Sequence, residues 1–168
     1  MKRIHGIAVA ALLAAPAAMA QDDDGAFVEF QVLKPEIALE MAQAALMSCR
    51  EAGYQVGVTV VDRFGLPQVF LRDRFAGPHV YETSRRKAWT AISFRTGTSE
   101  LAEATLEGKP SSGIRHLSEA LPLGGGLVVS EGGGSIVAGI GVSGAPEPQL
   151  DDECAAAGIA AVEDRIAF

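Results

Sequence analysis

The stretch from Gly124 to Gly144 constrains the fold most, because nine of its 21 residues are glycine and most of the others are small or β-branched. Two apolar runs, Leu127–Val129 and Ile136–Val142, flank the segment Ser130–Ser135. Short β-branched runs separated by a glycine-rich turn predict a β-hairpin. Glycines inside a strand are unfavourable and usually mark a close approach of another backbone or a ligand. We therefore predict a hairpin at the centre of a sheet, with a helix or a sister subunit against its second strand.

The same stretch contains Gly139, Gly141 and Gly144 at the spacing of a dinucleotide-binding loop. Such a loop requires a helix that begins at the third glycine. Pro146 and Pro148 follow instead and delay any helix. We therefore expect no nucleotide at this position.

The first 20 residues have the pattern of a secretory signal peptide. Lys2 and Arg3 precede an apolar run over residues 4–15, and Ala18-Met-Ala20 supplies the small residues of a cleavage site. The run is too short to cross a membrane. We predict a signal peptide over residues 1–20, cleavage near Ala20 and a periplasmic or secreted protein; the alternative is a buried N-terminal helix. Residues 21–34 then form an N-terminal segment, and 35–168 a single domain.

The charge balance limits the partners. The formal net charge is −7, and removal of the basic leader makes the chain more acidic. Nucleic acids and anionic lipids attract cationic surfaces. We expect no nucleic acid partner and no membrane insertion, and we interpret the acidic excess as a contribution to solubility.

The two cysteines, Cys49 and Cys154, are the only sulfhydryls of the chain. An exported protein meets an oxidising compartment, which favours a Cys49–Cys154 disulfide between the first and last predicted helices. Two buried free thiols are the alternative. A metal site is disfavoured because neither cysteine has a Cys or His at ligand spacing.

Hydrophobic periodicity predicts an antiparallel sheet with helices packed on it, which is an α+β fold. The segment Phe27–Leu33 is ambiguous and is interpreted as a short edge strand. The expected elements, in order, are a helix from Pro35 to near Gly53, a hairpin of Tyr54–Asp62 and Leu66–Arg72, a helix over Tyr81–Phe94, a short helix over Glu100–Leu106, the glycine-rich hairpin, and a final helix from Asp151 to about Ile166.

Few residues suggest chemistry. Arg85, Arg86 and Lys87 form a basic cluster that we interpret as a solvated helix face. His79 precedes a helix and His116 follows Arg115; each histidine suits a surface or capping role, or a role as a metal ligand. An imidazole can bind haem iron, and a neighbouring guanidinium can pair with a propionate. No nucleophile motif or acid/base pair stands out, so we expect a binding protein rather than an enzyme; an enzyme that degrades haem or converts a small molecule is the alternative.

Several motifs in order resemble the GlcG/HbpS family of haem-degrading domains. The resemblance covers about Pro35 to Phe168. It rests on Gly57-Val-Thr-Val-Val-Asp62-Arg-Phe-Gly65, Phe70-Leu-Arg72-Asp73, Lys87-Ala-Trp-Thr-Ala91, Gly124-Gly-Gly126, Gly139-Ile-Gly-Val-Ser-Gly144 and the late Asp151-Asp152.

The resemblance implies a profilin-like five-stranded antiparallel sheet, a homo-oligomer (a dimer or larger) and haem as the cofactor. It implies a role in haem storage, transfer or redox and iron sensing. In the family both a Thr and a His have been proposed as iron ligand, which corresponds here to Thr98 and to His116 or His79, with Arg115 beside them. We rank the two histidines above Thr98 because a hydroxyl is a weak iron ligand. The alternative function is a cofactor-free accessory or small-molecule-binding module of a periplasmic oxidation system.

Overall fold

The computed structural model describes residues 25–167, so the predicted leader lies outside the described residues. The chain divides into two units, one that ends at Phe30 and one from Gln31 onward. In the first unit, residues 25–30 carry no helix or strand. The second unit contains all the elements below.

The second unit is built on an antiparallel sheet with the strand order β2-β1-β4-β3. Its strands are β1 (Gly57–Asp62), β2 (Pro67–Arg72), β3 (Gly126–Ser130) and β4 (Ile136–Ser143). The expectation of five strands was wrong, since the described residues form four and Phe27–Leu33 forms none. In that segment only Leu33 is buried. Without cross-strand pairs or a buried face, β propensity alone does not hold a strand.

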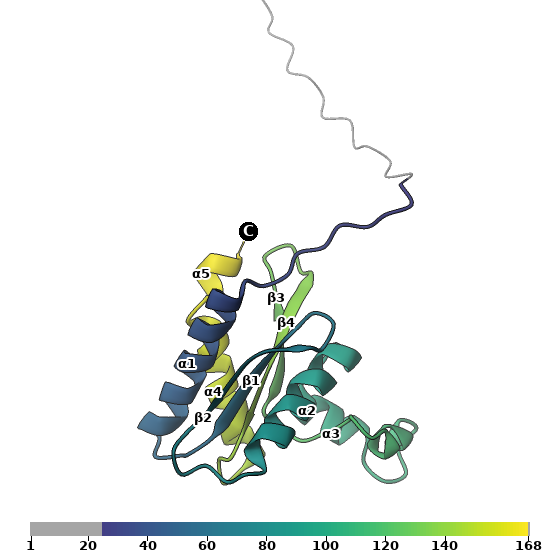
Figure 1. The fold of residues 1–168 in the computed structure, drawn as a ribbon. Coiled ribbons are helices and arrows are strands. Elements are labelled where there is room, and N and C mark those ends of the chain that lie inside the picture. Colours follow the sequence, from purple (N-terminus) through teal and green to yellow (C-terminus); the bar gives the residue numbers. More distant parts are fainter. Residues whose placement is uncertain (1–24, 168) are drawn as a thin grey trace, which may run out of the picture. The chain divides into compact units, whose positions relative to one another are not determined.

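Helices cover both faces of the sheet (Figure 1). Helices α1 (Pro35–Glu51) and α4 (Pro148–Ala160) pack on one face, and α2 (Val80–Phe94) packs on the other. Helix α3 (Thr98–Ala104) and the 3-10 turn η1 (Ser112–His116) lie between α2 and β3 in the chain. The predicted final helix is interrupted, because α4 ends at Ala160 and α5 spans Glu163–Ile166.

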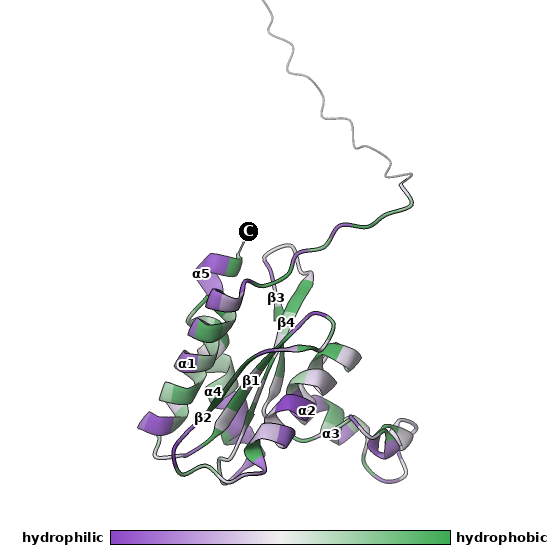
Figure 2. Ribbon diagram, viewed as in Figure 1, coloured by the Kyte–Doolittle hydropathy of each residue, from purple (hydrophilic) through white to green (hydrophobic). Residues whose placement is uncertain are grey.

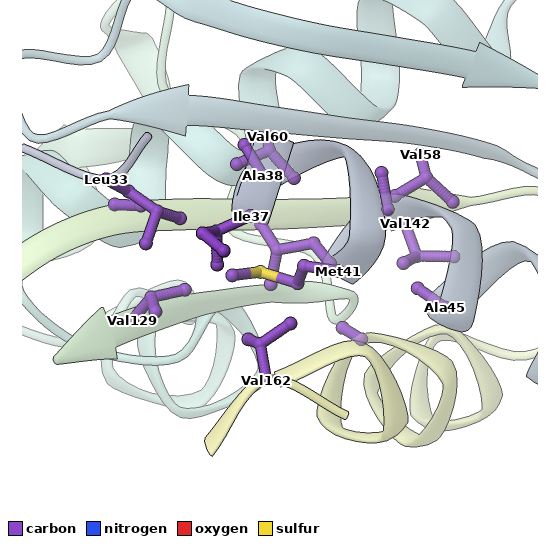
Figure 3. Packing of buried hydrophobic residues seen from close by; sticks show 14 of the residues in the cluster. Leu33, Ile37, Ala38, Met41, Ala45, Val58, Val60, Val129, Val142 and Val162 are labelled. Carbon is purple, nitrogen blue, oxygen red and sulfur yellow. The ribbon is translucent and has the colours of Figure 1, made fainter. Parts of the chain in front are cut away.

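The main core lies between the sheet and the pair α1 and α4 (Figure 3). Ile37, Met41 and Ala45 recur at helical spacing on the buried side of α1, as the periodicity predicted. They meet Val58 and Val60 of β1, whose side chains share one face of the sheet because alternate residues of a strand point the same way. Figure 2 shows the same pattern as colour, with mainly apolar central strands and helices that alternate between apolar and polar residues.

A disulfide joins Cys49 of α1 to Cys154 of α4, as the sequence predicted. The two Cα atoms lie 5.4 Å apart, and both side chains are buried. The bond links residues 105 positions apart, so it closes most of the second unit into one covalent loop.

The glycine-rich stretch forms the predicted hairpin, with β4 central and β3 at the edge of the sheet. Helix α2 lies directly on the glycines of β4. A methyl group on Gly139 would stand 2.6 Å from Cγ1 of Ile92, and one on Gly141 would stand 2.7 Å from the amide nitrogen of Ala88. The element pressed against the hairpin is therefore a helix of the same chain.

Candidate functional site

The polar centre of the domain is a buried ion pair between α2 and α4. The Lys87 ammonium donates to Oδ2 of Asp151 at 2.8 Å and to the carbonyl oxygen of Val142 on β4 at 3.0 Å. The Lys87 side chain is 1% exposed and that of Asp151 is 4% exposed. The interpretation of the basic cluster as a solvated face was thus wrong for Lys87.

Burial works against the charge of both partners. It lowers the pKa of Lys87 and raises the pKa of Asp151, while the attraction between the two opposes each shift. The other oxygen of Asp151 accepts the amide hydrogen of Ala145 at 3.0 Å. The Lys87 ammonium and both oxygens of Asp151 therefore each have a hydrogen-bond partner, which a buried ion pair requires. The pair joins two helices and a strand, and its burial closes it to a ligand.

Beside this pair, side chains of α3 and α4 hold the glycine triplet that leads into β3. Asp152 accepts hydrogen bonds from the Ser99 hydroxyl and from the amide of Gly125. The Thr98 hydroxyl accepts the amide hydrogen of Gly126 at 2.8 Å. Thr98, a predicted haem ligand, is buried, and its hydroxyl serves this backbone contact.

His116 lies exposed at the end of η1, in the segment between α3 and β3. Its neighbour Arg115 donates to the carbonyl oxygens of Thr105 at 2.7 Å and Ala102 at 2.9 Å, so the guanidinium satisfies carbonyls at the end of α3. The predicted propionate partner therefore has a structural role in this conformation.

Two arginines of α2 hold the rest of that segment. Arg85 pairs with Glu119 at 2.7 Å, and this contact lowers the pKa of the Glu119 carboxyl. Arg86 donates to the carbonyl oxygens of Glu119 and Ala120. The basic cluster thus fastens the segment that carries His116.

His79 lies exposed at the position before α2. Its carbonyl oxygen accepts hydrogen bonds from the amide and the hydroxyl of Thr83, and these bonds close the first turn of the helix. The structure therefore places His79, His116 and Thr98 on three different elements. Within residues 25–167, no group of three or more His, Cys, Asp or Glu side chains is arranged to hold a metal ion. Among the same residues, no helix has the length and apolar character needed to cross a membrane.

A family model described as "Haem degrading protein HbpS-like" matches residues 33–160. The chain belongs to the HbpS-like family. Corrinoid adenosyltransferase PduO of Citrobacter freundii is 31% identical over 128 residues, which are 75% of this chain and 38% of that protein. This HbpS-like chain therefore spans well under half the length of that curated relative.

Solved structures share the fold. The crystal structure of HbpS has a TM-score of 0.75 and 40% identity, covering 80% of this chain and 93% of the other. The crystal structure of a PduOC:heme complex has a TM-score of 0.73 and 29% identity, covering 77% of this chain and 94% of the other.

Sequence reasoning did not find the Lys87–Asp151 pair of this HbpS-like chain, although a sign of it was present. Ser84, Lys87 and Ala91 recur at spacings of three and four, the pattern of one helix face. That face is the one buried against the sheet. A lysine on it requires a buried anion, and Asp151 in the first turn of α4 provides one.

Proposed function

We propose that this chain binds haem. One observation carries the proposal: a relative of the same fold, alike over 77% of this chain at 29% identity, has been crystallised as PduOC with heme. The family description, which refers to haem degradation, supports the same cofactor. The proposed role is haem storage, transfer or redox and iron sensing by an exported homo-oligomer.

His116 is the first proposed iron ligand. Its imidazole is exposed, and two apolar side chains near it are exposed as well: Leu117 at 52% and Leu106 at 44%. Leu106 follows Thr105, whose carbonyl oxygen accepts a hydrogen bond from Arg115, the residue before His116. A porphyrin is largely apolar, so an exposed histidine among exposed leucines offers both a ligand for the iron and a surface for the ring.

His79 is the second proposed ligand, and aromatic residues lie near it in the sequence. Phe75 is 81% exposed and Tyr81 is 48% exposed. The ring of Tyr81 contacts Phe70 of β2 with centroids 4.7 Å apart, which fixes the aromatic group beside the start of α2. Either histidine can therefore meet iron at the surface of one subunit.

The test is a titration of haemin into the apo protein, followed by the Soret band. We expect a saturable shift of the Soret band in the wild type. The shift should be lost in the variant that lacks the ligating histidine, His116→Ala or His79→Ala. It should be retained in Thr98→Ser, which keeps the hydroxyl that bonds Gly126. If the wild type gives no shift, haem binding is rejected. If the double histidine variant gives the wild-type spectrum, the ligand assignment is rejected.

Export and assembly have separate tests. Cell fractionation of the full chain should place the protein outside the cytoplasm, shortened by about 20 residues. Light scattering of the purified protein should give a mass of at least two chains. An uncleaved cytoplasmic protein, or a monomer at all concentrations, would contradict these two parts of the proposal.

A further inference from the structure

A hollow of about 630 Å³ opens at one end of the sheet, and neither His79 nor His116 is among the residues that line it. Three segments form its walls: the β1–β2 turn, the β3–β4 turn and the C-terminal end of α2 (Figure 1). Its volume lies within the range of small-molecule sites, about 300–1,000 Å³. The lining residues are Arg63, Phe64, Ile92, Ser93, Arg95, Gly134, Ser135 and Ile136.

The charge of the hollow is opposite to that of the chain. Arg63 comes from the β1–β2 turn and Arg95 from the end of α2, so two separate elements each bring a guanidinium. None of the lining residues, all of them in the described part of the chain, is acidic. In a chain of formal net charge −7, this concentration of positive charge selects for an anion.

Asp62 and Glu131 lie close in the sequence to the lining turns, and each carboxylate accepts hydrogen bonds within its own turn. Asp62 accepts the amide hydrogens of Phe64 at 2.8 Å and Leu66 at 3.0 Å. Glu131 accepts those of Gly133 and Ser135, which lowers the pKa of its carboxyl. These bonds fix the two turns that form the walls, so the site is ordered before a ligand arrives.

Arg95 occupies an unusual backbone conformation. Its φ of 55° and ψ of 38° are left-handed, and it is the one non-glycine residue with positive φ among those described. Helices that end this way usually place glycine there. A non-glycine residue in this conformation is strained, and such residues cluster at functional sites. An arginine at this position thus indicates a use for its side chain.

The walls also include apolar surface. Phe64 is 60% exposed, and its ring lies 6.0 Å from the guanidinium carbon of Arg63. Ile92 and Ile136 are half-buried beside it. The ligand that fits combines anionic groups for the arginines with an apolar body for these side chains.

We propose that this hollow binds the carboxylate groups of an organic anion with an apolar or aromatic body. Two sources have this chemistry: a free small organic acid and the propionates of haem. The proposal does not depend on haem binding at either histidine, because a haem-free acid tests it.

The experiment is isothermal titration calorimetry of the full, haem-free protein with phthalate as the probe. Arg95→Gly removes the charge and suits the left-handed conformation, so the fold is preserved. Arg63→Gln removes the second charge. Arg72→Gln, at the end of β2 and outside the hollow, is the matched control.

We expect saturable phthalate binding that each hollow variant weakens at least about tenfold, as loss of a charge-assisted hydrogen bond does, while the control stays within about twofold. No binding by the wild type, unchanged binding by the Arg63/Arg95 double variant, or equal binding of inorganic phosphate would overturn the proposal.

A haemin titration separates the two sources of the carboxylate, a free organic acid and the haem propionates. Weaker haemin binding in both variants identifies the propionates, and unchanged haemin binding beside weakened phthalate binding identifies a free acid.

Discussion

The close packing of α2 on β4 predicts that Gly141→Ala destabilises the fold strongly. The added methyl group would clash with the carbonyl oxygen of Ser84 and stand 2.7 Å from the amide nitrogen of Ala88. Both atoms belong to the backbone of α2, so no side chain can rotate away. Ordinary carbon contacts lie at about 3.5–4.0 Å, and the helix must therefore withdraw by roughly 1 Å.

The size of the effect follows from that displacement. A gap of 0.5–1 Å forfeits about a quarter to a half of the dispersion energy across an interface. Overpacking alone costs about 1–3 kcal/mol. Because α2 also loses contact with β1 and β3, we expect the upper end, about 3 kcal/mol, or a fall in Tm of roughly 10 °C.

Urea unfolding of Gly141→Ala, with the midpoint and the m-value measured together, checks this expectation. Gly113→Ala is the matched control, since a methyl group there meets no atom within 4 Å. The control should change the free energy of unfolding by less than about 0.5 kcal/mol. A Gly141→Ala midpoint equal to that of the wild type would refute the packing argument.

Three further predictions concern charge and cross-linking. Lys87→Met and Asp151→Leu should each lower the free energy of unfolding by about 3–5 kcal/mol, since each leaves an unpaired buried charge. The double variant should lose less than the sum of the two. Additive losses in urea unfolding would contradict this. Arg50 lowers the pKa of Asp73, so that carboxylate stabilises the fold above about pH 4, and the benefit is lost as the pH falls through its folded pKa. Asp73→Asn should therefore flatten acid unfolding followed by circular dichroism; an unchanged acid profile counts against the pair. Reducing the disulfide should lower stability by roughly 4–5 kcal/mol, given its 105-residue separation, and equal midpoints with and without reductant would exclude this.

The sequence predicted the elements that depend on local pattern. The run from Ile37 to Cys49 repeats apolar residues at helical spacing, and α1 buries that face. The glycines of β4 indicated a close backbone neighbour, and α2 is that neighbour. In both cases the evidence is contained within one short segment.

Other features depend on which segments meet, and local pattern does not reveal this. The β propensity of Phe27–Leu33 suggested a strand, but a strand also needs an edge to pair with. Lys87 and Asp151 are 64 positions apart, and only the packing of α2 against α4 makes them partners. The sequence suggested Thr98 as a ligand because it does not show that the hydroxyl is already hydrogen-bonded. The partner, Gly126, lies 28 positions further along the chain.

The tight seat of α2 on the glycines of β4 also affects how ligands exchange. No space remains between this helix and the sheet at Gly139 and Gly141, and the hollow described above lies instead at the rim, on two turns and a helix end. Rim segments can open in nanoseconds to microseconds while the sheet and its helices stay closed, because only the latter share the global stability of the fold. A ligand can therefore enter and leave without partial unfolding, and substitutions in the turns can change which ligand is bound without weakening the core.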